Sequence, residues 1–536
     1  MMRKFCKEVI VGKPNTAHFT DCYTASGSRN VRGYFQRVKE GSEDIVDTPF
    51  ARGETTSDLL NSWNGILEQM SSTWPDLYEY EMEQKDKVGP LSYQKPLSER
   101  MESIEEYYTS IDLQSVPIND DAINCVVGEF SKLRGLRPRS KERTLENMKL
   151  STNSGTPYFN SKRRDTLPDS MPVKIEYPYI HTVGGTFRMS AVLGWRGQEG
   201  GPQVSDVKQR VIWMFPFSLN ILESTLYQPL VELCQRWNLV TPWVSNDAVD
   251  YKLTKLFKTK GSKDLIMCTD FSSFDQHFNG SMQHASLKIL SALCDNTPSS
   301  VEWIEDVYPV KYKIPMNYYI GEYFVGPHGM ASGSGGTNAD ETLAHRSLQH
   351  AAAISQRRKL NLNSMCLGDD GILSYPNIDP DAVLKEYTSH GQVMQESKQN
   401  ISTNTAVFLR RWYHHDYVIN GVNRGVYPTM RALGRMRYME RFIKPAYWNA
   451  KTVALRYLSI LENVKYHPMR NEFVRFCMKR DKYRLGIDIP GFLDNIQNIA
   501  DEAMSNIPDF FGYTKTLQGE SKNISNWWIV KYLQSL

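Results

Sequence analysis

Three aspartates stand beside short apolar runs in the middle of the sequence. Asp270 follows the apolar run 265–269, and Asp369 and Asp370 lie between the runs 365–367 and 372–375. If these runs are neighbouring strands, the three carboxylates meet, although two carboxylates about 4 Å apart repel by about 4 kcal/mol at an effective dielectric of 20. Hard divalent cations relieve such repulsion and can support in-line phosphoryl transfer. The alternative is that Asp-Asp-Gly marks only a type I′ turn without chemistry.

The elements that would position these aspartates follow from the apolar periodicity. Residues 265–269 have the pattern of a buried strand, and the two runs around 368–371 indicate a strand, a turn and a second strand. Two helical stripes lie between them, separated by a glycine-rich turn at 333–336. Their members are Met282, Ala285, Ile289 and Leu293 in the first stripe, and Leu343, Ser347, Ala351 and Ile354 in the second. The order strand, helix, helix, hairpin predicts an α+β fold with acids at strand ends.

The composition is that of a globular protein of several domains. The 536 residues carry 63 Lys plus Arg and 60 Asp plus Glu, which gives a net charge of +3. A surface for nucleic acid must therefore be local, and two segments are basic, 130–143 and 431–456. No run approaches the roughly 20 apolar residues that span a bilayer, and the N-terminal apolar run is too short for export. The eight cysteines are widely spaced, so we expect no zinc site.

Several short motifs occur in an order that resembles one family. These are Asp270-x4-Asp275, Ser332-Gly333-x3-Thr337 and Gly368-Asp369-Asp370, which resemble motifs A, B and C of viral RNA-dependent RNA polymerases. Lys208-Gln209-Arg210 is similar to motif F, Ser154-Gly155-Thr156-Pro157 to the template-guiding motif G, Lys398 to motif D, and Phe408-Leu409-Arg410 to motif E. The sequence around these motifs is most similar to picobirnavirus polymerases, followed by partitivirus polymerases.

The resemblance implies roles for the acidic residues. Asp270 and Asp369 would hold two Mg²⁺ ions, for which Mn²⁺ can substitute, and Asp370 would support them. Asp275 would sense the ribose 2′-hydroxyl of the incoming nucleotide. The family often has asparagine four residues after the motif B threonine, whereas Glu341 stands there in this chain. For Asp340 and Glu341 we favour a structural role, in which they stabilise the first turn of a helix whose N-cap is Thr337.

The resemblance also implies roles for the other motif residues. Ser332, Gly333 and Thr337 would form the loop beside the nascent base pair and begin the helix behind it. Lys208 and Arg210 would bind the triphosphate, because Arg can form paired hydrogen bonds with phosphate oxygens. Lys398 would act as a general acid toward pyrophosphate, although an exposed loop lysine is an alternative. The residues expected to contact RNA are Ser154, Gly155, Arg410, Arg435 and Arg437, whereas Phe408 is expected in the core.

The implied fold is a right hand with fingers, an antiparallel palm sheet with helices, and a helical thumb. We expect an N-terminal extension at 1–65 packing on fingers or thumb, fingers at 66–224, palm at 225–293, a fingers insertion at 294–325, palm at 326–425 and thumb at 426–536. We expect Trp527 and Trp528 to pack within the thumb; the alternative is that they reach into the RNA channel and support initiation.

The expected activity is template-directed RNA synthesis from NTPs. Expected partners are template and product RNA, NTPs and a viral capsid protein, with no membrane. The picobirnavirus resemblance implies a double-stranded RNA genome and a location in the virion interior and the host cytoplasm. Two alternatives remain: a two-metal RNA nuclease, and a non-catalytic RNA-binding protein associated with a capsid.

Overall fold

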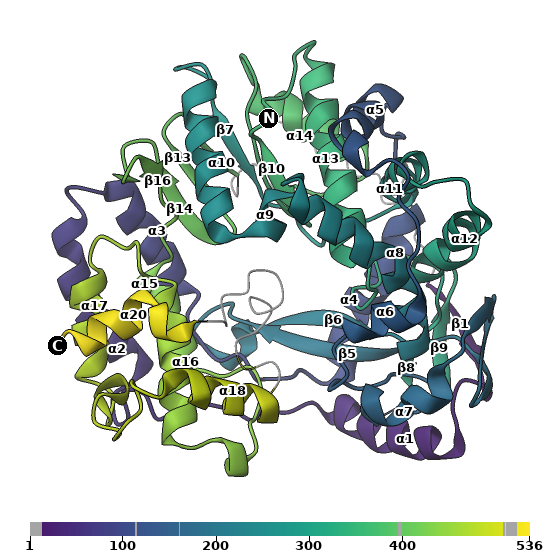
Figure 1. Ribbon diagram of the computed structural model, residues 1–536, viewed down its shortest axis with the longest axis horizontal. Helices are drawn as coiled ribbons and strands as arrows, with labels where there is room; N and C mark the ends of the chain where they lie inside the picture. The colour runs from purple at the N-terminus through teal and green to yellow at the C-terminus, as the bar shows by residue number, and fades with distance from the viewer. Residues whose placement is uncertain (1–12, 113–114, 160, 395–398, 508–509, 511–522) are drawn as a thin grey trace.

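The computed structural model describes residues 13–112, 115–159, 161–394, 399–507, 510 and 523–536 (Figure 1). The helices are α1 (Ala25–Glu40), α2 (Thr56–Leu67), α3 (Pro75–Asp86), α4 (Leu97–Thr109), α5 (Asp120–Glu129), α6 (Lys141–Glu146), α7 (Arg163–Ser170), α8 (Phe217–Arg236), α9 (Thr241–Val244), α10 (Asn246–Thr259), α11 (Gly280–Leu293), α12 (Pro298–Glu302), α13 (Thr337–Ser355), α14 (Pro380–Ser389), α15 (Thr429–Arg437), α16 (Ala450–Glu462), α17 (Arg470–Met478), α18 (Ile496–Asn506) and α20 (Trp528–Gln534). The strands are β1 (Asn15–His18), β2 (Lys174–Glu176), β3 (Tyr179–Thr182), β4 (Gly185–Arg188), β5 (Ala191–Gln198), β6 (Lys208–Met214), β7 (Ile266–Thr269), β8 (Met316–Tyr319), β9 (Glu322–Val325), β10 (Met365–Leu367), β11 (Asp370–Leu373), β12 (Asn400–Ser402), β13 (Thr405–Phe408), β14 (Arg411–His414), β15 (Val418–Ile419) and β16 (Val422–Asn423).

A four-stranded antiparallel sheet in the order β10-β11-β7-β12 forms the palm. All four residues of β7 are buried, because both faces of the sheet are covered. Ile266 and Cys268 pack on one face with Leu253 of α10, whereas Met267 and Leu373 lie in the larger core on the other face. The continuous apolar run that predicted this strand thus reflects burial on both sides, and the predicted α+β class is confirmed.

The hairpin between β10 and β11 is tighter than the sequence predicted. Leu367 pairs with Asp370, so only Gly368 and Asp369 form the turn, and β11 begins at Asp370. Gly368 has a φ of 58°, whereas Asp369 is not among the residues with positive φ. A type I′ turn needs positive φ at both loop positions, so the type I′ alternative is wrong for this turn.

A second, five-stranded sheet extends from the fingers toward the C-terminal helices. Its order is β1-β9-β8-β5-β6, and all pairs are antiparallel except β5 with β8. Strands β5 and β6 are the longest of these, and Figure 1 shows them crossing the middle of the molecule below the palm. The sheet therefore brings residues of β6 opposite the palm.

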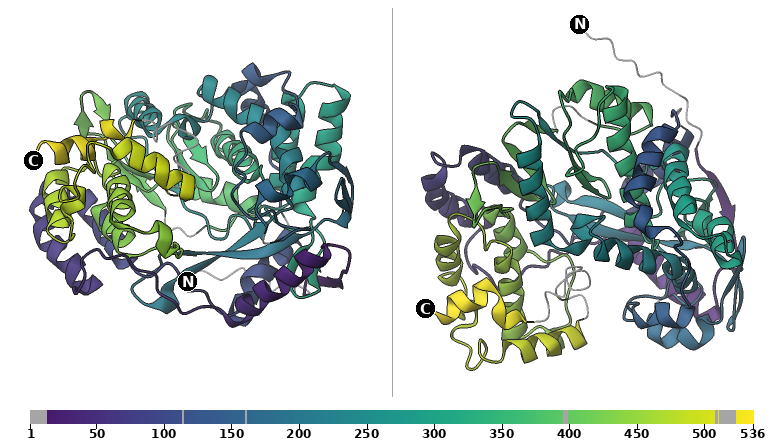
Figure 2. Two further views of the ribbon diagram at one scale, coloured as in Figure 1. Left: turned by 60° about the horizontal axis from the view of Figure 1, so that its bottom comes forward. Right: turned by 45° about the horizontal axis from the view of Figure 1, so that its top comes forward.

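The N-terminal region divides between two hydrophobic cores. Phe35 of α1 lies in the larger core with the fingers and palm, whereas Trp63 of α2 and Leu77 of α3 share the second core with α15, α16 and α17. Figures 1 and 2 show α2 and α3 beside the C-terminal helices, far from α1. The domain boundaries given above stay a prediction, but this packing places α3 with the thumb. Trp527 and Trp528 pack against the same second core, as expected.

The acid-rich run of α3 is not wholly at the surface. Glu81 is fully buried, and its carboxylate accepts hydrogen bonds from the backbone N–H groups of Thr429 and Met430, at 2.7 and 2.9 Å, at the start of α15. His467 contacts the same carboxylate at 2.9 Å. Although an acid-rich run is typical of a surface, Glu81 lies inside and anchors the N-terminal segment to the thumb.

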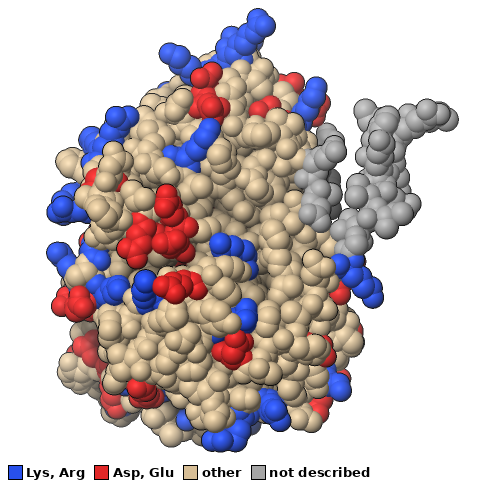
Figure 3. Space-filling view, turned by 90° about the vertical axis from the view of Figure 1, so that its right-hand side faces the viewer, with Lys and Arg blue, Asp and Glu red and all other residues tan. Residues whose placement is uncertain are grey.

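Charges on the outer face of the fingers are mixed. Figure 3 shows Lys and Arg interspersed with Asp and Glu on this side, without one continuous basic patch. Within the described ranges, no helix has both the length and the apolar character needed to cross a bilayer. All cysteines in these ranges are free, and Cys268 and Cys366 are buried.

His328 gives the fold an expected dependence on pH. The ring is fully buried and stacks on Trp213 with a centroid distance of 4.3 Å. Burial outweighs the contacts with the Gly329 and Ile314 carbonyls and lowers the His328 pKa from 6.5 to about 4. Below pH 6.5 the unfolded chain binds the proton more readily than the folded chain, so the free energy of unfolding should fall by about 3 kcal/mol as the pH drops to about 4.

Urea titrations at pH 7 and pH 5 check this expectation. His328→Asn should weaken the pH dependence, whereas His284→Asn, at an exposed position of α11, should leave it unchanged. Equal pH dependence in wild type and His328→Asn would contradict the assignment.

Candidate active site

The palm sheet brings the three predicted carboxylates to one edge. Asp270 follows β7 directly, and the register pairs Thr269 with Gly371, so the next position places Asp270 opposite Asp370. Asp369 occupies the turn beside them. The predicted convergence of Asp270 with the Asp369–Asp370 turn is therefore confirmed by the register of β7 and β11.

The carboxylates of the turn lie in an unfavourable electrostatic environment. Asp369 is exposed to solvent but has protein around it on most sides, and this desolvation, followed by repulsion from Asp275, raises its pKa. Desolvation, followed by repulsion from Asp369, raises the pKa of Asp370 to about 7. One oxygen of Asp370 also accepts a hydrogen bond of 2.9 Å from the backbone N–H of Leu409. Arg210 and Arg410 lower the pKa values of Asp369 and Asp370, but less than desolvation raises them, so a bound cation would supply the balancing charge.

The donor set suits a hard divalent cation without forming a complete cage. In the described part of the chain, no three His, Cys, Asp or Glu side chains are gathered closely enough to hold an ion. Mg²⁺ in phosphoryl-transfer sites is commonly held by one or two carboxylates together with substrate phosphates. Asp270, Asp369 and Asp370 fit that arrangement, because they supply oxygen donors at one edge and leave positions for substrate oxygens.

Asp275 connects this edge to the glycine-rich loop 332–336. The Ser332 hydroxyl donates a short hydrogen bond to the Asp275 carboxylate, and the Met330 N–H donates to the Asp275 carbonyl at 2.8 Å. Glu341 is buried next to them, and burial, followed by repulsion from Asp275, raises its pKa well above the ordinary value. A protonated Glu341 can donate a hydrogen bond to Asp275. Three side chains thus converge at the predicted position of ribose recognition.

The acids of the first turn of α13 do not cap it. The N-cap is Gly336, and Thr337 is the first helical residue, whose hydroxyl donates to the Ser334 carbonyl at 3.2 Å. Asp340 is fully buried, and it accepts hydrogen bonds of 2.7 Å from the hydroxyls of Tyr227 and Tyr312. The capping role expected for Thr337, Asp340 and Glu341 is therefore wrong, because packing against other helices takes these acids inside.

Gly333 is held against the end of β6. A Cβ atom at Gly333 would lie 1.6 Å from the backbone oxygen of Trp213. No larger residue fits without moving either the loop or the strand. The close approach fixes the loop beside Asp275 and explains why glycine stands at this position.

Lys208 and Arg210 face the same side of β6, because strand residues two apart share a face. Both side chains are exposed, and the Arg210 Nε donates to the Gln198 side chain at 2.8 Å. Arg210 lies close enough to Asp369 to lower the pKa of that carboxyl, although less than burial raises it. The basic strand thus lies across from the aspartates, as expected for a triphosphate site.

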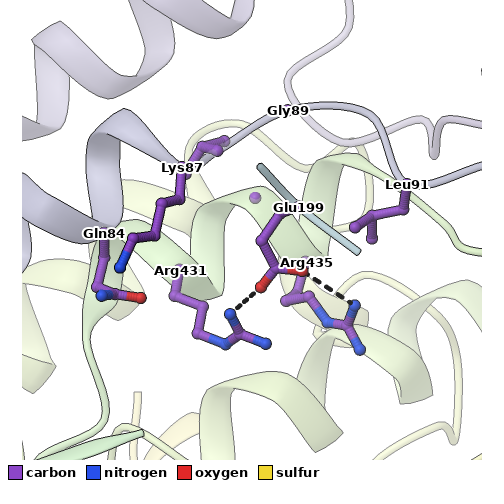
Figure 4. Close-up of a pocket in the computed structure, with 9 residues that line it drawn as sticks. Gln84, Lys87, Gly89, Leu91, Glu199, Arg431 and Arg435 are labelled. Carbon is purple, nitrogen blue, oxygen red and sulfur yellow. Dashed lines mark ion pairs between the residues drawn. The ribbon is translucent and has the colours of Figure 1, made fainter. Parts of the chain in front are cut away.

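Glu199 joins the tip of the β5–β6 hairpin to the thumb. Its carboxylate forms ion pairs with Arg431 and Arg435 of α15, the second at 4.0 Å (Figure 4). It also forms an ion pair with Arg410 at 3.6 Å. Arg196 of β5 adds two hydrogen bonds of 2.7 and 3.2 Å to Glu440. These contacts fasten the fingers hairpin to the thumb and place Arg410 and Arg435 together beside it.

Arg437 has a different environment from Arg435. Its guanidinium donates hydrogen bonds to the backbone carbonyls of Phe50 and Ala51 at 2.7 and 3.0 Å. These contacts hold the N-terminal segment against α15. Arg437 therefore has a structural role and is not among the residues proposed below to bind RNA.

The predicted template-guiding motif is tightly packed. Ser154 is buried, and a Cβ atom at Gly155 would lie 2.1 Å from the Phe215 backbone oxygen. The direct RNA contact expected from Ser154 does not fit this burial, so the two residues position the segment instead. Phe408 is fully buried, as expected, and Lys398 lies outside the described residues.

Sequence reasoning missed two acids that organise the site, Glu199 and Glu223. Glu223 is a fully buried residue of α8 that binds the loop 332–336. In the sequence, Glu223 is one of three charged residues in a helix of mixed composition, so nothing singled it out, and Glu199 had no signal apart from its place in a hairpin tip.

An antiparallel palm sheet with paired aspartates, facing a basic fingers strand and closed by a helical thumb, defines a right-hand nucleic-acid polymerase. The family model for viral RNA-dependent RNA polymerase matches residues 78–431. The chain belongs to this family of viral RNA-dependent RNA polymerases.

Individual relatives agree with this assignment. A potential RNA-dependent RNA polymerase of human picobirnavirus (strain Human/Thailand/Hy005102/-) is 48% identical over 516 residues, which cover 94% of this chain and 96% of the relative. The RNA-directed RNA polymerase of Cryptosporidium parvum virus 1 (strain KSU-1) is 28% identical over 173 residues, covering 31% of this chain and 32% of the relative.

A solved structure supports the fold. The crystal structure of the RNA-dependent RNA polymerase of a human picobirnavirus is similar with a TM-score of 0.91 and 47% identity, and the match covers 96% of this chain and 98% of that one. The expected right-hand fold is confirmed.

Proposed function

We propose that this polymerase replicates and transcribes a double-stranded RNA genome by a two-metal nucleotidyl transfer. The observation that carries the proposal is the register that sets Asp270 opposite the Asp369–Asp370 turn, with Lys208 and Arg210 across from them. The 3′-hydroxyl of a primer or initiating nucleotide attacks the α-phosphate of an incoming NTP, and pyrophosphate leaves. Bound Mg²⁺, or Mn²⁺ in its place, supplies charge stabilisation for the attacking and leaving oxygens.

The chain's own residues divide the remaining work. Asp270, Asp369 and Asp370 provide oxygen ligands, and Lys208 and Arg210 bind the triphosphate. Asp275, with Ser332, is placed to test the ribose 2′-hydroxyl, while Gly333 and Thr337 shape the loop. Lys398 remains proposed as the proton donor to pyrophosphate.

RNA is proposed to pass between the palm and the fingers hairpin. Arg410 and Arg435 would contact its backbone, and Ser154 and Gly155 would hold the segment that guides the template. Such phosphate contacts do not depend on the RNA sequence. They weaken as the salt concentration rises, because the release of counterions from the RNA then contributes less to binding. The outer face of the fingers, where charges are mixed, is not expected to contribute.

The cellular setting is proposed from the resemblance to picobirnavirus polymerases. We propose that the chain works in the virion interior and the host cytoplasm and contacts a capsid protein. Copurification of the polymerase with intact particles from infected cells would support this setting.

Purified protein tests the proposed reaction directly. With Mg²⁺, the four NTPs and an RNA template of defined ends, it should synthesise a complementary strand and release one pyrophosphate per nucleotide. A nuclease would shorten the RNA without NTPs, and a purely RNA-binding protein would bind without synthesis. Parallel reactions on single-stranded and double-stranded templates, with and without a primer, show which templates the polymerase copies and whether its initiation needs a primer. Shortening of the template to the same extent with and without NTPs, with no synthesis of a complementary strand, would overturn the proposal.

A further inference from the structure

The glycine-rich loop 332–336 rests on a buried carboxylate that no motif assigns. Glu223 of α8 has no exposed surface. Its two oxygens accept hydrogen bonds from the Ser334 hydroxyl at 2.5 Å and from the Gly335 N–H at 2.9 Å. The loop that carries Ser332 and Gly333 is therefore hydrogen-bonded to α8.

Asn220, one turn earlier on α8, continues this network. Its amide N–H₂ group donates to Glu223 at 3.0 Å and to the Gly333 carbonyl at 3.3 Å. Its amide oxygen accepts a hydrogen bond of 2.8 Å from the Arg163 guanidinium. One asparagine thus joins the loop to an arginine at the start of α7.

Arg163 is in turn attached to the template-guiding segment, residues 152–157. The Arg163 N–H donates to the Thr152 carbonyl at 3.0 Å, and the Phe217 N–H of α8 donates to the Ser154 carbonyl at 2.8 Å. Gly155 and Gly333 also lie so close to the backbone oxygens of Phe215 and Trp213, respectively, that neither position has room for a Cβ atom. The template-guiding segment and the nucleotide loop therefore share the same support.

The loop provides most of the hydrogen bonds that offset the desolvation cost of the buried Glu223 carboxylate. Among the described residues it forms no ion pair, and burial raises its pKa. A buried carboxylate is costly unless hydrogen bonds satisfy it, and two of its three donors belong to the loop. Displacing the loop would leave the carboxylate with one hydrogen-bond donor, Asn220, and with the favourable charge of Lys311, so the carboxylate still favours the loop position that supplies the other two donors.

We propose that Arg163, Asn220 and Glu223 form a hydrogen-bonded link through which the template-guiding segment fixes the loop 332–336 in the position that selects the incoming nucleotide. They are positioning residues that act through Ser332, and the inference rests on the function proposed above. The consequence is that correct seating of template RNA at residues 152–157 improves the binding of the next NTP.

Single-nucleotide incorporation on a primed RNA template tests the link. In Glu223→Gln the side chain can no longer accept all three hydrogen bonds, so KM for the NTP should rise about tenfold while kcat changes much less. Discrimination between the NTP and its 2′-deoxy analogue should fall as well. Affinity for the RNA template should stay the same, because no RNA contact is removed.

Asp250→Asn is the matched control. Asp250 is also fully buried, its pKa is also raised by burial, and it likewise binds a hydroxyl and a glycine N–H, those of Tyr413 and Gly425. It differs from Glu223 in forming ion pairs with Arg411 and Arg424 as well, so its substitution is at least as severe a change to a buried carboxylate. It lies on α10, away from the loop. Both substitutions should lower the melting temperature, but only Glu223→Gln should change KM for the NTP and the ribose discrimination.

Two further variants keep the test decisive. Ser334→Ala removes only one donor and should raise the same KM by a smaller factor even if Glu223→Gln does not fold. Arg163→Met should also raise KM, and its combination with Glu223→Gln should be no worse than Glu223→Gln alone, because both interrupt one link. An unchanged KM in folded Glu223→Gln or Ser334→Ala, or additive effects in the double variant, would overturn the link. Wild type that incorporates no nucleotide would instead refute the proposed function.

Discussion

Asp369→Asn should reduce nucleotide incorporation by about a hundredfold to a thousandfold, because it removes charge that, in the proposed mechanism, would hold the cations at the reacting phosphate. The same change should leave the free energy of unfolding unchanged or increased in the absence of divalent ions. Desolvation, followed by repulsion from Asp275 and Asp270, raises the Asp369 pKa, and a neutral amide of the same shape relieves both.

Incorporation at saturating NTP, together with urea unfolding in EDTA, measures both effects. Asp381→Asn, in the exposed first turn of α14, is the control that should change neither quantity. An Asp369→Asn protein that retains wild-type incorporation would refute the assigned role, and one that unfolds more easily would refute the electrostatic account.

Gly333→Ala should be nearly as damaging, for a steric reason. The added Cβ would lie 1.6 Å from the Trp213 backbone oxygen, so the loop must move away from β6. We expect a stability cost of about 1–3 kcal/mol. Because Ser332 and its contact with Asp275 would move with the loop, incorporation should fall by about a hundredfold.

Gly335→Ala provides a control within the same loop. Its Cβ would meet the Ser224 hydroxyl at 3.3 Å as its nearest neighbour, and the backbone φ at Gly335 is not positive. Because the Ser224 hydroxyl needs to move only slightly, incorporation and melting temperature should fall much less than in Gly333→Ala. Equal damage from both alanines would show that loop flexibility, rather than the contact with Trp213, explains the effect of Gly333→Ala.

The parts of the site that could be predicted from sequence are those set by local periodicity and by motif spacing. The buried run before Asp270 gave β7, and the apolar runs around Gly368 gave the β10–β11 hairpin. Antiparallel pairing of neighbouring apolar strands then brings Asp270 to Asp370. These features depend on residues close in sequence or on one sheet register.

Contacts between distant segments could not be predicted in this way. Glu223 binds a loop more than a hundred residues away, and Glu81 binds the start of α15 from a run that has the composition of a surface. Burial of a charged side chain depends on which helices pack around it, and a single sequence does not contain that information. The structural contacts of Arg437, which was predicted to contact RNA, could not be predicted for the same reason, because its partners are backbone carbonyls of the N-terminal segment.

The ion pairs from Arg196 and Glu199 to the thumb have a topological consequence. Fingers, palm and thumb are joined along the chain, and these pairs join the fingers back to the thumb, so the protein closes into a loop around its active site. An RNA strand can enter such a closed protein only by passing one of its free ends through it. A covalently closed RNA circle has no free end. We therefore expect that it cannot serve as a template unless a nuclease cuts it or these ion pairs break.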